Sequence, residues 1–321
     1  MIDLHQDLVL SYQKNQKQFF DFDPTTYDDS LKINVWSLQD YKKAWMFWVF
    51  WAVWPYDLEW DLEDKETRKI TFNEDLMREY ITTYKRLAES NDVNILTYWE
   101  FDTHISHLSI LIHIEGLDLD ISEEYIDKLY NEQVRSIWFV RNFDNYLSHC
   151  NLHPYRWITK KWHQIIQYMN KKWMIVDTAH MSDRAMMDVC RIAEKPIINS
   201  HSNLKAHKQH TRNVSDNFLK ELAKNWWVQW LSLCASFQDA SDEKFENYTK
   251  QIDYVYNLVW DDHVAFWSDL HWLTRNDIIW GITNIQNVEQ LHERIVAKFW
   301  SSFSQKFFFD NANRVVKQNI W

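Results

Sequence analysis

Short apolar runs alternate with amphipathic segments along most of the chain, and this rhythm constrains the fold more than any other feature. Eight runs have the length and the aliphatic or aromatic character of strands: residues 2–7, 45–54, 108–115, 134–141, 173–180, 196–201, 228–234 and 264–269. Charged segments with helical spacing lie at residues 73–90, 123–132, 159–172, 183–193, 215–224, 244–259, 287–299 and 304–318. Eightfold alternation predicts an α/β fold, a single-domain (β/α)8 barrel of the TIM type, in preference to an open doubly wound sheet.

The longest insertion in this pattern lies between the second and third runs, at about residues 55–107. We expect it to contain a helix and a loop that lie over the barrel mouth. No stretch of linker composition divides the chain, so residues 1–321 are predicted to form one domain.

Charge and composition exclude several classes of partner. The formal net charge is -11 and Lys and Arg form no long run, so a nucleic-acid partner is not expected. The most apolar stretch, residues 44–54, is too short to span a bilayer, and no signal peptide is visible at the start. Cys150, Cys190 and Cys234 are widely spaced, which suits a reducing compartment. We therefore expect a cytoplasmic protein without a membrane partner.

Metal-binding and acid–base residue types gather where the predicted strands end. Five of the runs end in His5-Gln6-Asp7, Glu115, His180, His201 and Asp269. The carboxyl ends of barrel strands carry the active site, so these side chains are expected at one rim. His5 and Asp7 are two residues apart and point the same way from a strand. This mixture of nitrogen and carboxylate ligands suits zinc, although each residue alone has a structural interpretation as a hydrogen-bonded side chain.

Longer stretches around these residues match a known family. They are His5-Gln6-Asp7, Ile114-Glu115-Gly116, and residues 169–180 (MNKKWMIVDTAH), 196–202 (PIINSHS), 212–216 (RNVSD), 263–269 (HVAFWSD) and 311–315 (NANRV). Their order, and the 21-residue step from His180 to His201, agree with the family pattern. On these residues the chain resembles the membrane dipeptidases, zinc peptidases built on an amidohydrolase-like barrel.

The resemblance implies a site with two zinc ions. The implied ligands are His5 and Asp7 for one ion, His180 and His201 for the other, and Glu115 as the bridge between them. Arg212 would hold the substrate carboxylate, and Asp269 would handle the proton and the free amine. A hydroxide held between the ions would attack the peptide carbonyl of a dipeptide, so that Glu115 and Asp269 are the catalytic candidates. The resemblance also makes a homodimer an expected state.

Two positions depart from the family pattern. Arg141 stands where the family often has a histidine that helps to bind the carbonyl oxygen, and Leu270-His271-Trp272 replaces Phe-Asp-Gly after Asp269. Arg141 can still stabilise an oxyanion and is a substrate-binding candidate. The alternatives stay open: another metal hydrolase acting on a lactone or an amide, or a barrel without activity.

The chain is poor in glycine and rich in tryptophan, with 2 Gly and 20 Trp. Average usage would give roughly 22 Gly. Many tryptophans take glycine positions of the family pattern, namely Trp45, Trp48, Trp51, Trp173, Trp226, Trp227, Trp260, Trp267, Trp272 and Trp300, whereas Trp54 and Trp321 do not. We hypothesise that UGA codons of the gene are read as glycine; a truly tryptophan-rich protein is the alternative. The hypothesis predicts strain at Trp173, Trp226, Trp227, Trp260 and Trp267.

Overall fold

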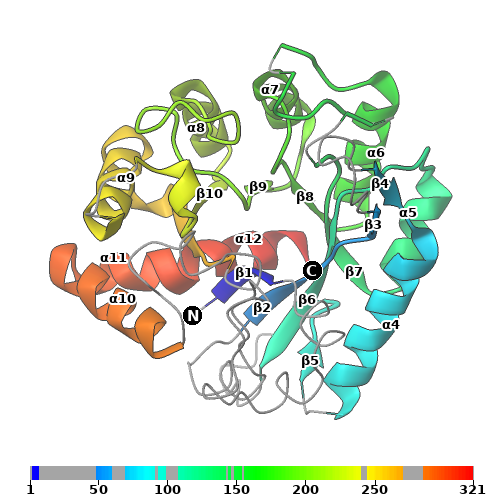
Figure 1. The fold of residues 1–321 in the computed structure, drawn as a ribbon, viewed down its shortest axis with the longest axis horizontal. Helices are drawn as coiled ribbons and strands as arrows, with labels where there is room; N and C mark the ends of the chain where they lie inside the picture. The colour runs from blue at the N-terminus through cyan, green and yellow to red at the C-terminus, as the bar shows by residue number, and fades with distance from the viewer. Residues whose placement is uncertain are drawn as a thin grey trace.

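A parallel sheet that curls on itself forms the centre of the molecule (Figure 1). The computed structural model describes residues 2–6, 48–59, 69–90, 93–98, 108–141, 144–145, 148–153, 155–239, 244–269 and 285–320. The strands of the sheet are β1 (Ile2–Gln6), β2 (Trp48–Val53), β5 (Asn94–Ile95), β6 (Ser109–Glu115), β7 (Val134–Trp138), β8 (Ile175–Asp177), β9 (Ile198–Asn199), β10 (Val228–Ser232) and β11 (Val264–Trp267). Their order is β1-β2-β6-β7-β8-β9-β10-β11, with β5 beside β6.

The two ends of this order, β1 and β11, contact each other, so the eight strands enclose a barrel. Every strand in the path pairs in parallel with its neighbour. Each of the eight apolar runs contains one of these strands. The predicted (β/α)8 barrel is therefore confirmed.

Helices lie around the outside of the strands (Figure 1). They are α5 (Glu123–Asn131), α6 (Lys160–Lys171), α7 (Asp183–Ile192), α8 (Asp216–Lys224), α9 (Lys244–Val259) and α10 (Ile285–Lys298), with short turns η3 (Ala235–Phe237) and η4 (Asp261–His263). Ser122, Thr159, Ser182 and Ser215 begin four of them, each side-chain oxygen accepting the backbone N–H three residues further on. In the described part of the chain, no helix has both the length and the apolar character needed to cross a membrane.

The chain closes the amino end of the barrel with its last helices, α11 (Ser301–Gln305), η6 (Lys306–Asp310) and α12 (Asn311–Asn319). Nδ2 of Asn319 donates to the carbonyl of Pro196 at 2.8 Å, just before β9. The Arg314 guanidinium donates to the carbonyls of Trp226 and Asp262, just before β10 and β11. The apolar side chains of α12 pack into the barrel interior with those of the strands. A site can therefore open at the carboxyl ends of the strands.

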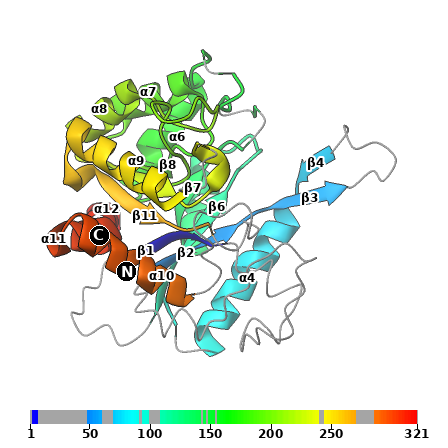
Figure 2. The same cartoon turned by 60° about the vertical axis from the view of Figure 1, so that its left-hand side comes forward.

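The insertion at residues 55–107 contains a β-hairpin and a long helix. The hairpin pairs β3 (Tyr56–Glu59) with β4 (Lys69–Phe72), and α4 (Glu74–Ser90) follows. Figure 2 shows the hairpin projecting away from the barrel. The expected helix is present, whereas the hairpin was not expected. A position over the barrel mouth stays a prediction.

Left-handed backbone occurs at a few non-glycine residues: among the described residues they are Gln133, Trp173, His180, Trp226, Trp260 and Asp269. The strain predicted at Trp173, Trp226 and Trp260 is confirmed. Trp227 and Trp267 are buried and lie outside the left-handed region, so they show no strain of this backbone kind. At Trp267 the conflict is one of packing, because its ring centroid lies 4.0 Å from that of His201.

Candidate metal centre at the strand ends

His180 and His201 follow β8 and β9 and come together at the carboxyl rim. Their ring centroids are 5.0 Å apart, and both residues are buried. His180 has a φ of 64°, and the backbone N–H of Asn151 donates to its carbonyl oxygen at 2.8 Å. A non-glycine residue keeps this conformation only where the surroundings impose it, and such residues cluster at functional sites. The two imidazoles form the centre of the candidate site.

One carboxylate positions both histidine turns, and sequence reasoning missed it. Asp177 is the last residue of β8 and is fully buried. Its Oδ1 accepts the backbone N–H of Ala179 at 2.9 Å and that of Ser200 at 3.2 Å, and its Oδ2 accepts the Ser200 hydroxyl. These two residues directly precede His180 and His201. The available sequence signal is an acidic residue inside an otherwise apolar run, since such residues are rarely buried without partners.

Glu115 ends β6 and is paired with Arg141. Nη2 of Arg141 lies 3.0 Å from Oε1 of Glu115, whose side chain is 1% exposed. The pairing lowers the cost of burying both charges. Gly116 follows with a φ of 83°, and a Cβ there would lie 2.6 Å from the hydroxyl oxygen of Tyr56. The turn after Glu115 therefore requires glycine.

Asp269 and Arg212 approach His201 from two sides. Asp269 follows β11 with a φ of 56°, and its Oδ2 lies 3.8 Å from Nε2 of His201. Nη2 of Arg212 donates to the His201 carbonyl at 2.7 Å, while its buried Nε has no hydrogen-bond partner in the described part of the chain. Burial, followed by the charge of Arg141, lowers the pKa of Arg212 to about 9, although Asp269 and Glu115 raise it. A guanidinium with a spare donor suits a carboxylate ligand.

Two indoles lie against the histidine pair. The ring of Trp138, at the end of β7, lies 4.9 Å from that of His180 and 5.1 Å from that of His201, measured between centroids. The ring of Trp267, at the end of β11, lies 4.0 Å from that of His201. Both tryptophans are fully buried. Aromatic side chains thus fill the space beside the imidazoles.

The structure brings most of the predicted site residues to one rim: Glu115, Arg141, His180, His201, Arg212 and Asp269. His5 lies in β1, and Asp7 lies outside the described residues. Imidazole nitrogens and carboxylate oxygens are the donors that zinc takes in catalytic sites, so the residues present fit that metal. The roles assigned to them stay predictions.

A second group of metal-type side chains lies in the loop after β7. One ligand atom from each of Asp144, Cys150 and His153 falls within 4.8 Å of the others. Oδ2 of Asp144 lies 2.7 Å from Nδ1 of His153 and 2.9 Å from Nδ1 of His149. Burial alone would raise the pKa of Asp144, but hydrogen bonds from His153, from the Cys150 backbone and from His149 hold it well below its usual range. These hydrogen bonds explain why the side chains lie together without a metal ion. We call the cluster of Asp144, His149, Cys150 and His153 the brace.

The same loop supports the turn that carries His180. The backbone N–H of Ser182 donates to the carbonyl of His149 at 2.9 Å, and Asn151 donates to His180 as described above. The loop lacks regular periodicity, so its spacing in the sequence does not indicate that its histidines meet Asp144. The brace thus links Asp144 to the left-handed backbone of His180.

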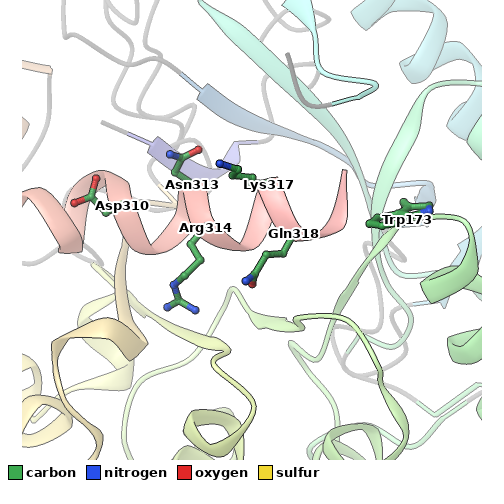
Figure 3. A pocket seen from close by; sticks show the side chains of 6 residues that line it. All are labelled: Trp173, Asp310, Asn313, Arg314, Lys317 and Gln318. Atoms are coloured by element: carbon green, nitrogen blue, oxygen red, sulfur yellow. The ribbon is translucent and has the colours of Figure 1, made fainter. Parts of the chain in front are cut away.

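A cavity of about 570 Å³ lies at the opposite end of the barrel (Figure 3). Its lining residues are Trp173, Asp310, Asn313, Arg314, Lys317 and Gln318. They come from η6, α12 and the turn before β8. None of the predicted site residues in the described part of the chain lines it.

Comparisons with known proteins agree with this geometry. The sequence model of the family described as membrane dipeptidase (peptidase family M19) matches residues 1–320. The chain is similar to a dipeptidase of Claviceps purpurea (strain 20.1), with 34% identity over 107 residues, 33% of this chain and 25% of that protein. It is also similar to an uncharacterised protein of Klebsiella pneumoniae from the region 5′ of pqqA, with 26% identity over 162 residues, 49% of this chain and 59% of that protein. Each match thus spans less than two thirds of the relative.

Solved structures share the fold. A metallopeptidase of Rhodobacter sphaeroides, bound to a phosphinate mimic of the dipeptide L-Ala-D-Ala, superposes with a TM-score of 0.80 and 16% sequence identity. The superposition covers 100% of this chain and 99% of that protein. At this identity the likeness supports the barrel architecture.

Proposed function

We propose that this chain, which belongs to the membrane dipeptidase family, is a zinc-dependent dipeptidase. The observation that carries the proposal is the meeting of two imidazoles with buried carboxylates and a half-buried guanidinium at one rim. The imidazoles and Glu115 offer donors for zinc. Arg212 offers a cation to one end of a dipeptide, and Asp269 offers an anion to the other. Such a site reads both charged termini of a short substrate.

The proposed ligands follow the order of the strands. His5 and Asp7 would hold one zinc ion, His180 and His201 a second, and Glu115 would lie between the two. Bound zinc polarises a peptide carbonyl and lowers the pKa of water. Asp177 keeps the histidine turns in place through the backbone bonds at Ala179 and Ser200.

The remaining rim residues would orient the substrate and move the proton. Nε of Arg212 is positioned to donate to the substrate carboxylate. Asp269 lies beside His201, where its carboxylate can accept a proton from the attacking water and pair with the free amine. Arg141, held 3.0 Å from Glu115, would donate to the oxygen of the peptide carbonyl as negative charge develops.

Hydrolysis of blocked and unblocked dipeptides tests this proposal. The protein is stripped of metal with a chelator and assayed before and after zinc is added. We expect zinc to restore cleavage of unblocked dipeptides, and the N-acetyl and C-amide forms to be cleaved much more slowly because each lacks one terminal charge. Zinc-dependent cleavage of a lactone without cleavage of any dipeptide would contradict the proposal and favour the alternative hydrolase.

A matched pair of histidine variants locates the activity. His180→Ala should abolish hydrolysis while the protein stays folded, because it removes a proposed ligand. His163→Ala, in α6 on the outside of the barrel, should keep the activity of the parent. Equal activity in the two variants would exclude His180 from the site.

A further inference from the structure

Tryptophans occur both at left-handed turns and at the strand ends beside the histidine pair. The turn tryptophans, Trp173, Trp226 and Trp260, each follow a helix with a φ of 59°, 60° and 71°, respectively. The rim tryptophans, Trp138 and Trp267, end two strands beside the histidine pair. The two groups differ in location and in their contacts, so they provide independent observations.

The turn tryptophans occupy the helix-ending position that glycine usually takes. After α6, the N–H of Met174 donates to the carbonyl of Met169 at 3.0 Å, and that of Trp173 to the carbonyl of Asn170 at 3.3 Å. This pair of bonds is the Schellman motif, whose left-handed residue is usually glycine because a Cβ is disfavoured there. The end of α8 repeats both bonds around Trp226.

Burial of the indole does not offset this conflict at the other turns. Trp226 is 61% exposed and Trp260 is 71% exposed. The N–H of Trp260 donates to the carbonyl of Tyr256 at 2.9 Å, which is the simpler helix ending that also favours glycine. The backbone bonds are those of well-formed helix ends, and only the side chain is unsuited to them.

Several buried indoles lack the hydrogen bond that a tryptophan needs. Within the described part of the chain, Nε1 finds no hydrogen-bond partner in Trp48, Trp51, Trp162 or Trp230. A buried indole N–H normally finds a partner, because an unsatisfied donor is costly. The ring of Trp162 also lies 3.6 Å from that of Phe139 between centroids, closer than the usual spacing of about 4.5–7 Å. These positions would be relieved by removing the indole.

The rim tryptophans take up space that the proposed chemistry needs. The ring of Trp138 lies beside both imidazoles at ordinary aromatic spacing, whereas the ring of Trp267 lies 4.0 Å from that of His201, closer than the usual spacing of about 4.5–7 Å. Gly116, at the end of β6, shows that this rim does use glycine where a Cβ would collide with a neighbour. Removing two indoles here would open the barrel next to the histidines.

We infer that UGA codons of this gene are read as glycine, so that the natural protein has glycine at the turn and rim tryptophans. Glycine at 173, 226 and 260 relieves the left-handed turns. Glycine at 138 and 267 makes these two positions determinants of access, because it gives metal and substrate room beside His180 and His201. Only the identity of the metal and the substrate that would use this space rests on the proposed function.

Peptide masses of the protein isolated from its own cells test the inference directly. Trypsin cleavage after Arg135 and Arg141 releases residues 136–141, which contain position 138, and cleavage after Lys172 and Arg184 releases residues 173–184, which contain position 173. We expect both peptides to have the masses of the glycine forms. Tryptophan at both positions overturns the inference, and tryptophan at 138 alone overturns its claim about the rim.

Zinc titration of two recombinant forms tests the consequence for the site without using activity. One form has the printed sequence, and the other carries Trp138→Gly and Trp267→Gly. We expect the glycine form to bind zinc roughly tenfold tighter or more, the scale of changes close to metal ligands. Equal or weaker binding by a folded glycine form contradicts the inference about access.

Thermal unfolding of a separate variant keeps the inference testable if the double variant does not fold. Trp226→Gly should raise the midpoint of unfolding, whereas Trp157→Gly, at an exposed residue without left-handed backbone, should not. No rise for Trp226→Gly contradicts the account of the turns. If the masses show glycine and the glycine form binds zinc without cleaving dipeptides, the inference stands and the proposed function fails. The dipeptide assays are therefore run with the glycine form.

Discussion

The two ends of the barrel both contain left-handed residues, but the side chains there are in opposite situations. At the carboxyl end, His180 and Asp269 are buried. Asn151 donates to the His180 carbonyl, and Asp177 accepts the backbone N–H of the preceding Ala179. At the amino end, Trp226 and Trp260 are mostly exposed. The backbone angle alone does not separate a functional residue from a misplaced one. The contacts of the side chain and of its neighbours distinguish the two cases, because they show what imposes the conformation.

The largest effect is expected at the carboxyl end, from Asp177→Asn. The variant keeps the shape of the side chain but weakens the acceptors for Ala179 and Ser200, so both histidine turns lose their common anchor. We expect zinc affinity or hydrolysis to fall about 10–100-fold, as for other groups that orient metal ligands. Asp188→Asn, on the outer helix α7, is the matched control and should change neither. An Asp177→Asn protein with parental zinc affinity and activity would show that the histidine turns keep their conformation without the Asp177 carboxylate.

At the amino end we expect a smaller effect, which is a gain in stability rather than a loss of function. A left-handed conformation costs a non-glycine residue roughly 1–2 kcal/mol. Substitution by glycine removes this cost, but the greater flexibility of glycine in the unfolded chain offsets part of the gain in stability. Trp226→Gly should therefore raise the free energy of unfolding by about 1 kcal/mol. Urea denaturation measures the change. His180→Gly would remove the same backbone strain but should abolish zinc binding. Unchanged or tighter zinc binding by this variant would contradict the difference between the two ends of the barrel.

The smallest effect concerns the brace behind His180. Asp144 faces His149, His153, Arg156 and the backbone N–H of Cys150, and its folded pKa is depressed. Its contribution to stability is therefore fully present above its unfolded pKa of about 3.9 and is lost as the pH falls through the folded value.

Comparison with Asp144→Asn measures this contribution. The difference in free energy of unfolding between parent and variant should be constant above about pH 5 with respect to this carboxyl and should shrink toward more acidic pH. A difference that stays unchanged down to about pH 2 would mean that Asp144 has an ordinary pKa in the folded protein.

The strands and outer helices could be predicted because burial imposes periodicity on them. All eight runs contain strands, although β8 and β9 are shorter than their runs because the chain turns before His180 and His201. The β3–β4 hairpin was missed because its strands are short and carry charges. When such strands pair with each other, their backbone N–H and C=O groups are hydrogen-bonded, and no apolar face is needed to form the hairpin.

The ligand-type residues of the site were visible because they interrupt apolar runs at the strand ends. The supports were not visible in the same way. Asp177 ends β8, and its partners include backbone N–H groups, which no residue type reveals. Asp144 meets its histidines through loop geometry that lacks a repeating pattern. Sequence spacing therefore indicates which chemistry meets at a rim, whereas the groups that hold it require coordinates.

Zinc stoichiometry of the His180→Ala variant tests the central claim most directly. The glycine form of the chain, its His180→Ala variant and its His163→Ala variant are loaded with zinc, dialysed and analysed for bound metal. We expect two zinc ions in the parent and the His163→Ala protein, and the loss of at least one from the folded His180→Ala protein. Equal zinc content in all three proteins would contradict a metal centre at the carboxyl rim.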